Sequence, residues 1–364
     1  MCTLLPMLTL YVGALLRTLT QKSAWTRVFP PEFQEHCECN DYGREKMFAL
    51  IQFLCQRDLH QDFYIPVSIT MFLVYCVSLV ANSIVIILIS HRRQLHQPMY
   101  IIIRNLSFSD LLFDTITLPK IIAKYWFNAG SISYYPCVFQ MFFVHYLGSI
   151  DSLVLMLMAI DRYVAICTPL RYHSIITNKL VTIICYCFWM FNGTRVSVIS
   201  ALAAKLHYCG PNKIKNCFCS LTFLIPLACE DQTFLKTLSY IFAMVVLLLP
   251  LSIILLSYIL IIIVVHSAAG SENWQKAFYT CMTHLFVIGL YYVPRVFVYS
   301  ISQIAFMVDA NVNVLILCLY TYIPHVASPI IYCLRTKEIR SVLISQKIFD
   351  SKTNHKVSAV QLSS

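Results

Sequence analysis

Long apolar segments recur along this chain, and they constrain its fold more than any other feature. A helix needs about 20 mainly apolar residues to cross a bilayer. Segments of that kind run near 64–90, 99–122, 138–162, 179–203, 236–264, 275–300 and 312–333. Because lipid cannot hydrogen-bond exposed backbone groups, we expect each segment to be a helix. The predicted fold class is an all-α membrane protein, a seven-transmembrane helix bundle.

Composition excludes several classes of protein. Of the 364 residues, 59% are hydrophobic and 12% are charged, whereas a soluble domain has about 45–50% and about 25%. This excludes a water-soluble domain, a disordered chain, a coiled coil and a nucleic-acid-binding domain. The lipid bilayer is therefore the first expected partner. The net charge of +10 is more typical of membrane orientation than of nucleic-acid binding.

Lysine and arginine residues in the loops predict the orientation of the bundle. They gather in 91–98, in 162–179 and after 334, and basic loops face the cytosol. We expect the N-terminus outside, the C-terminus in the cytosol and a multi-pass protein of the plasma membrane. The loop 204–236 is an exception to this rule, because it carries four lysines on the predicted outer side.

The same reasoning divides the chain into three parts. Residues 1–63 form an extracellular tail, of which 1–46 fits an upstream extension of the gene, with Met47 as the start. Residues 64–334 form the seven-helix domain. Residues 335–364 form a cytoplasmic tail with a short amphipathic helix, whose basic residues would meet anionic lipid.

Motifs at the helix ends carry a family resemblance. The first inner loop runs from Leu95 to Tyr100, the third helix ends with the run from Met158 to Cys167, and the sixth begins with the run from Lys276 to Leu285. The seventh helix closes with the run from Ser328 to Tyr332. In this order the motifs resemble class A rhodopsin-like G-protein-coupled receptors, and within them odorant receptors. The run from Tyr291 to Arg295 looks like the fish-type branch.

The resemblance covers about residues 64–340 and implies a function. An odorant receptor binds a small molecule within its helices and activates a heterotrimeric G protein, here the olfactory stimulatory type that raises cyclic AMP. It is not an enzyme, and the sequence has no catalytic or metal-ligand motif. Two alternatives stay open, a non-olfactory class A receptor and a nonsignalling relic. A transporter would show internal repeats, and none is found.

The resemblance assigns coupling to the G protein to two helix ends. Asp161 and Arg162 close the third helix, and release of Arg162 from its ionic neighbours would admit the G protein. Tyr258 and Tyr332 would stabilise the opened state. The remaining members of the coupling set are Tyr163 and Pro329.

Two carboxylates inside the bundle predict an ion or proton site. Ionisable groups in the bilayer core are costly, and Asp110 and Asp151 cannot both ionise cheaply without a cation. The resemblance implies a sodium ion beside Asp110, with no other cofactor or metal. Ser328 stands where the family usually has Asn, so we expect an altered site. A protonated, hydrogen-bonded pair is the alternative.

Counting helical turns outward from Arg162 predicts a mostly apolar ligand pocket. Its expected members are Met141, Val144, His145, Gly148, Ser149, Phe242, Val246, Tyr292, Arg295, Tyr299 and Tyr322. Arg295 should pair with an internal acid, meet an anionic ligand or reach the outer interface. Since no acid lies near it in the sequence, we expect the ligand to be anionic, with the outer interface as the alternative.

The cysteines divide into two groups. Most of the 16 lie inside apolar segments, where cysteine acts as a small hydrophobic residue. On the oxidising outer side pairing is favoured, and the resemblance implies the disulfides Cys137–Cys219 and Cys209–Cys229. Cys37, Cys39 and Cys217 are left unassigned.

Overall fold

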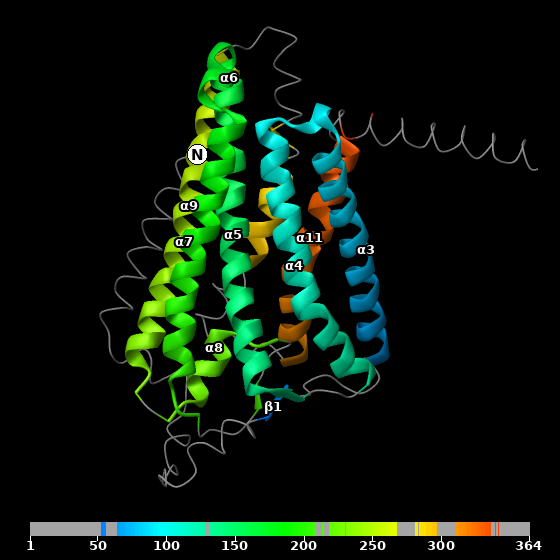
Figure 1. The fold of residues 1–364 in the computed structure, drawn as a ribbon, viewed down its shortest axis with the longest axis vertical. Coiled ribbons are helices and arrows are strands. Elements are labelled where there is room, and N and C mark those ends of the chain that lie inside the picture. Colours follow the sequence, from blue (N-terminus) through cyan, green and yellow to red (C-terminus); the bar gives the residue numbers. More distant parts are fainter. Residues whose placement is uncertain are drawn as a thin grey trace, which may run out of the picture.

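The chain forms a bundle of long helices that run side by side along one axis (Figure 1). The computed structural model describes residues 52–55, 64–127, 131–208, 213–214, 218–229, 231–267, 281–282, 284–296, 310–335, 339 and 341. Its long helices are α3 (Tyr64–His91), α4 (Pro98–Trp126), α5 (Tyr134–Cys167), α7 (Asn178–Ala204), α9 (Thr233–Ser267) and α11 (Ala310–Arg335). Residues 284–296 are also helical. All seven expected segments therefore contain helix.

Four of these helices, α3, α5, α7 and α9, are long and apolar enough to cross a membrane by themselves. Helix α4 falls outside this group, and it carries Asp110 and Asp114 among its buried residues. A charged residue inside a membrane bundle faces the interior or a partner. We therefore expect the two buried acids of α4 to belong to a functional site inside the bundle.

Helix α5 lies in the middle of the bundle and contacts α4, α7 and α9. The side chains of Ile150, Val154 and Met158 on α5 are fully buried and belong to the largest apolar cluster. Because lipid tails are as apolar as these side chains, close packing rather than hydrophobic burial holds such helices together. This central position makes α5 the element that brings the other helices to one site.

Local sequence explains where several helices begin. Pro98 opens α4, where its missing N–H costs nothing. The Thr177 hydroxyl accepts a hydrogen bond from the Leu180 N–H at 3.2 Å, which caps α7. Before α9, the Thr233 hydroxyl and N–H donate to Asp231 at 2.6 and 3.0 Å. These two hydrogen bonds hold the pKa of the Asp231 carboxyl below its usual value.

A small sheet covers one end of the bundle. Its strands are β1 (Gln52–Cys55), β2 (Ser131–Ser133) and β3 (Lys213–Ile214), in the order β2-β1-β3. Strand β1 pairs antiparallel with β2 and parallel with β3. The short helix α8 (Leu221–Leu224) lies toward the same end, and the four-residue α6 (Tyr172–Ile175) marks the opposite end (Figure 1).

Part of the expected extracellular tail is a strand. Residues 52–55 of this tail form β1, the middle strand of the sheet. Most of the predicted amphipathic helix near 335–344 lies outside the described residues, as do residues 1–51. The three-part division therefore stays a prediction, except that part of the tail pairs with two loops.

Candidate functional site

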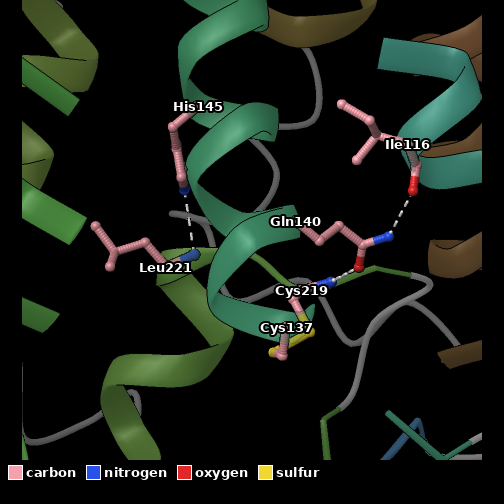
Figure 2. Close-up of a disulfide and its surroundings, with 6 residues drawn as sticks. All are labelled: Ile116, Cys137, Gln140, His145, Cys219 and Leu221. Carbon is pink, nitrogen blue, oxygen red and sulfur yellow. Dashed lines mark hydrogen bonds between the residues drawn. A yellow bond between two sulfur atoms is a disulfide. The ribbon is translucent and has the colours of Figure 1, made fainter. Parts of the chain in front are cut away.

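A disulfide joins the second long loop to the start of α5. Cys137 and Cys219 are bonded, with their Cα atoms 5.3 Å apart, which confirms that pairing. Figure 2 shows Gln140 next to it, where its side-chain amide donates to the Ile116 carbonyl at 3.1 Å and its Oε1 accepts from the Cys219 N–H at 2.9 Å. Three segments distant in sequence therefore meet at this point.

The other predicted disulfide is described at one end only. Cys229 is disulfide-bonded, and its expected partner, Cys209, lies outside the described residues. Cys37, Cys39 and Cys217 lie outside them as well. The pairing of Cys229 with Cys209 therefore stays a prediction.

His145 holds the same loop across the bundle end. Its Nε2 accepts a hydrogen bond from the Leu221 N–H at 3.1 Å, with Leu221 beginning α8 (Figure 2). The Ser220 hydroxyl lies 3.5 Å from the same nitrogen. An Nε2 that accepts carries no proton, so the ring is the neutral form protonated on Nδ1. This member of the predicted pocket therefore positions the loop.

Gly148 and Ser149 line a polar part of the bundle interior. The Tyr291 hydroxyl donates to the Gly148 carbonyl at 2.8 Å, and no atom lies within 4 Å of where a Gly148 Cβ would stand. Arg195 of α7 donates to the Ser149 hydroxyl at 2.6 Å and to Asn192 at 3.1 Å. The structure thus places open space and a cation beside two predicted pocket residues.

Arg195 was not among the predicted site residues, although the sequence shows that it lies inside an apolar segment. It is a basic residue in the middle of α7, and an ionisable residue inside a span is a functional candidate by default. Its guanidinium carbon lies 5.8 Å from the Phe242 ring centroid, which is within reach of a cation–π contact. Arg195 thus brings Phe242 and Ser149, both predicted pocket residues, toward one group.

Further hydrogen bonds connect α5 to α9 and to helix 284–296, and α4 to α11. The Ser152 hydroxyl donates to the Val246 carbonyl at 2.9 Å, so its lone pairs accept from the Tyr292 hydroxyl at 2.6 Å. The Tyr322 hydroxyl donates to Thr117 at 2.9 Å. These bonds fix Val246, Tyr292 and Tyr322 relative to α5 and α4.

The remaining pocket residues are placed as follows. Met141 is fully buried in an apolar cluster with Cys219 and Leu221, and Val144 packs against the cluster that contains Tyr322. Tyr299 lies outside the described residues. The described part of the chain has a cavity of about 520 Å³ between α4, α5 and β2, and no predicted pocket residue lines it. The composition of the ligand pocket stays a prediction.

The most concentrated group of charges lies deeper, around His325 of α11. Its Nδ1 lies 2.8 Å from Asp114 Oδ1, and the Ser78 hydroxyl donates to Asp114 Oδ2 at 2.5 Å. Its Nε2 lies 3.6 Å from Asp110 Oδ1 and 3.9 Å from Asp151 Oδ2. The side chains of the histidine and the three acids are at most 3% exposed. We call these four residues the acid–histidine cluster.

Asp110 and Asp151 do come together, but two members of the cluster were missed. Asp114 follows Asp110 by four residues, which places both on one face of a helix. His325 lies in the apolar segment expected at 312–333, and histidine counts as neutral in the net charge of the sequence. Treating histidine as an intramembrane ionisable residue would have identified it.

Ser328, the third residue expected at the ion site, makes a hydrogen bond within its own helix. It is buried, and its hydroxyl donates to the Pro324 carbonyl of its own helix at 2.7 Å. Asn82 of α3 instead reaches α11, since its side-chain amide donates to the His325 carbonyl at 3.1 Å. Asn82 thus links α3 to the backbone of α11 at His325.

No acid lies near Arg295 in the sequence, but the fold brings two acids close enough for its charge to act on them. Its guanidinium carbon is 3.5 Å from the Tyr291 ring centroid, and its charge acts on both Asp110 and Asp151. One terminal nitrogen is buried without a partner among the described residues, so this nitrogen does not reach the outer interface. The acids come from α4 and α5, which only the packed bundle brings near.

The opposite end of α5 carries Arg162. Its guanidinium pairs with Asp161 at 2.9 Å and contacts the Met99 sulfur, while the Tyr172 hydroxyl donates to Asp161 at 2.8 Å. Asp161 is thus held by α6, and Arg162 by Asp161. This is the ionic restraint that the sequence predicts at this helix end.

Two tyrosines of the coupling set lie near this restraint. The Tyr332 hydroxyl donates to the Met158 sulfur at 3.2 Å, whereas the buried Tyr258 hydroxyl has no partner within the described residues. The charge of Arg162 acts on both phenols. Tyr163 is half-buried against the core, and Pro329 lies inside α11. Arg162 therefore has two acceptor groups available if Asp161 releases it.

The sequence of this chain is similar to those of known proteins. The sequence model of the family "Olfactory receptor" matches residues 71–351. Human olfactory receptor 52K1 is 34% identical over 279 residues, which are 77% of this chain and 89% of that protein. Rat olfactory receptor 1496 is 33% identical over 290 residues, 78% of this chain and 90% of that protein.

A solved structure supports the fold separately. The crystal structure of squid rhodopsin superposes with a TM-score of 0.64 at 16% identity and covers 80% of this chain and 87% of the rhodopsin chain. This likeness shows the seven-helix fold, and the sequence matches show the family. The chain belongs to the olfactory receptor family.

Proposed function

We propose that this protein binds an odorant inside the helix bundle and activates a heterotrimeric G protein of the olfactory stimulatory type. One observation supports it most directly: Arg162 is restrained by Asp161 at 2.9 Å, while the Tyr258 hydroxyl near it has no partner among the described residues. A restrained cation with an alternative acceptor close by is a two-state element. A ligand can shift such an element by its difference in affinity for the two states.

The proposed orientation follows the basic loops. The sheet and the disulfide would face outside, and the end with Arg162 would face the cytosol, as the positive-inside rule favours. Olfactory receptors are multi-pass proteins of the plasma membrane, and theirs is a receptor family rather than an enzyme family.

Replacing Arg162 by Ala is expected to abolish the odorant-evoked rise of cyclic AMP in cells that express the receptor. The substitution removes the charge that would leave Asp161 and meet the G protein. The matched control is Arg171→Ala, because Arg171 is exposed at the same bundle end and takes no part in the restraint. A response that survives in Arg162→Ala, at equal surface expression, would reject the coupling role.

We further propose that the odorant is anionic and meets Arg295. The supporting observation is the buried terminal nitrogen of Arg295 that lacks a partner among the described residues. Open space beside Gly148, whose carbonyl binds Tyr291, gives room near the same side chains. A ligand carboxylate would form a charge-assisted hydrogen bond with the guanidinium.

Replacing Arg295 by Gln is expected to weaken the response to carboxylic-acid odorants by at least tenfold and to leave that to neutral odorants unchanged. The reason is that Gln keeps hydrogen bonding but removes the charge. Dose–response curves for an acid and its methyl ester measure the difference. Arg195→Gln is the control, since Arg195 already binds Ser149 and Asn192. Equal losses for acid and ester would contradict an anionic ligand.

We also propose that Asp110 and Asp151 hold a cation. Sodium, which the resemblance implies, is a hard ion served by oxygen ligands. An imidazole nitrogen lies 3.6 and 3.9 Å from these two carboxylates, and imidazole suits transition metals better. The residues present therefore fit sodium poorly.

A further inference from the structure

We propose that the acid–histidine cluster binds a divalent transition-metal ion, for which zinc is the natural probe, through His325 Nε2, Asp110 and Asp151. One ligand atom from each of these residues lies within 4.8 Å of the other two. Such an ion would regulate the proposed receptor by joining α4, α5 and α11. The inference rests on the proposed function only for that regulatory role, because binding itself needs no signalling.

The orientation of the imidazole is the first argument. His325 Nδ1 lies 2.8 Å from Asp114 Oδ1, so in the neutral ring the proton sits on Nδ1 and points at Asp114. The Nε2 lone pair then faces Asp110 and Asp151. A lone pair facing two carboxylates is repulsive unless something positive lies between them.

Asp114 and Ser78 supply the support that metal-binding histidines usually have. Such a histidine donates its other ring N–H to a carboxylate, which fixes the tautomer and raises the basicity of the ligand. Here the carboxylate is Asp114, and it is itself held by the Ser78 hydroxyl at 2.5 Å. Asn82 holds the His325 backbone carbonyl at 3.1 Å. The ring is therefore positioned from two sides.

The distances favour a metal over direct hydrogen bonds. Nitrogen–oxygen hydrogen bonds are about 2.7–3.2 Å long, whereas Nε2 is 3.6 Å from Asp110 and 3.9 Å from Asp151. Zinc bonds of about 2.0–2.2 Å in a tetrahedron hold neighbouring ligand atoms roughly 3.3–3.6 Å apart. The two nitrogen–oxygen distances match that spacing after a shift of a few tenths of an ångström.

Unpartnered atoms form an independent observation. Within the described residues, His325 Nε2 and both carboxylate oxygens of Asp151 are buried without a hydrogen-bond partner. The Ser109 hydroxyl donates to the Leu147 carbonyl at 3.4 Å and is also close enough to act on Asp151. Buried polar groups are nearly always satisfied, so these atoms mark a place for a ligand that bonds all of them.

The charges select the valence of that ligand. The cluster holds three carboxylates, and the charge of Arg295 acts on two of them. Metal binding requires deprotonated ligands, and with such ligands three carboxylates and one guanidinium leave two negative charges. A divalent cation compensates both of them, whereas a sodium ion compensates one.

The test uses the purified full-length receptor in lipid nanodiscs, titrated with cobalt(II) as a spectroscopic substitute for zinc. We expect one cobalt ion per receptor with ligand-field absorption bands typical of nitrogen and oxygen ligands, displaced by one equivalent of zinc. His325→Gln should lose these bands. His266→Gln, which changes an exposed histidine, should keep them and is the matched control.

A second variant keeps the proposal falsifiable if His325→Gln fails to fold. Asp114→Asn retains all three ligands but weakens the support of the ring, and loss of such support usually costs 10–100-fold in metal affinity. Cobalt bands that are unchanged in both variants would overturn the proposal. Charge-transfer bands of a thiolate would also overturn it, because they would place the metal on a free cysteine such as Cys187.

Absence of any cobalt binding to the folded receptor would overturn it too, and would leave a proton shared by His325 and the acids as the occupant. The result is separable from the proposed function. Arg162→Ala should still bind cobalt while failing to signal, so a loss of signalling and a loss of metal binding are scored on different variants.

Discussion

Replacing Cys219 by Ser is expected to lower the free energy of unfolding by about 2–5 kcal/mol, the usual cost of losing a native disulfide. The bond to Cys137 closes a loop between residues 82 positions apart. Without it, the hydrogen bonds of the loop to Gln140 and His145 would remain. Thermal unfolding of the receptor in nanodiscs measures the loss.

The matched control is Cys187→Ser, because Cys187 is an exposed free cysteine of α7. Its loss should change the free energy of unfolding by no more than about 0.5 kcal/mol. Surface labelling of intact cells should show the same contrast, with Cys219→Ser largely retained inside. Equal unfolding temperatures for the two variants would show that the disulfide does not stabilise the bundle.

Replacing Asp114 by Ala is expected to cost about 3–5 kcal/mol, as removal of one partner from a buried charged pair usually does. Asp114 is fully buried, and it is the acceptor for both His325 Nδ1 and the Ser78 hydroxyl. Its removal leaves both donors without that acceptor. The measurement is again the unfolding temperature in nanodiscs.

Two controls separate charge from volume at this position. Asp114→Asn keeps the size and one acceptor oxygen, so its loss should be clearly smaller than that of Asp114→Ala. Thr117→Val, one turn away, removes the acceptor of Tyr322 and should cost about 1 kcal/mol, the worth of one hydrogen bond. Equal losses in Asp114→Ala and Thr117→Val would show that the cluster adds no special stability.

The two ends of the receptor are connected through one helix. Helix α5 carries the disulfide at Cys137, the loop anchor His145, the cluster residue Asp151 and the restraint at Arg162. Every site described above therefore shares a rigid element with the others. A small displacement of α5 at one of these residues would therefore also displace the others.

Much of the fold was predictable because membrane insertion is a local property of the sequence. Each apolar segment must satisfy its own backbone hydrogen bonds, so α3, α5, α7 and α9 follow from hydropathy without knowledge of their packing. The run around Arg162 and the Cys137–Cys219 pairing were likewise accessible, since they depend on motifs in fixed order.

Contacts between helices were not accessible in this way. His325 and Asp114 lie 211 positions apart, and nothing local links them. Arg195 reaches Ser149 across 46 positions, and β1 pairs with two loops that follow it. Sequence patterns report which face of a helix is polar, but not which other helix supplies the partner.

By itself the sequence determined where the long helices of the described residues lie and which family the chain resembles, because these depend on apolar length and short motifs. The tertiary structure alone decided that His325 joins Asp110, Asp114 and Asp151, and that the charge of Arg295 acts on two of these acids. The physical reason is that a buried charge is stabilised by whichever partner the packing of the bundle brings near, and that packing is a property of all the helices together.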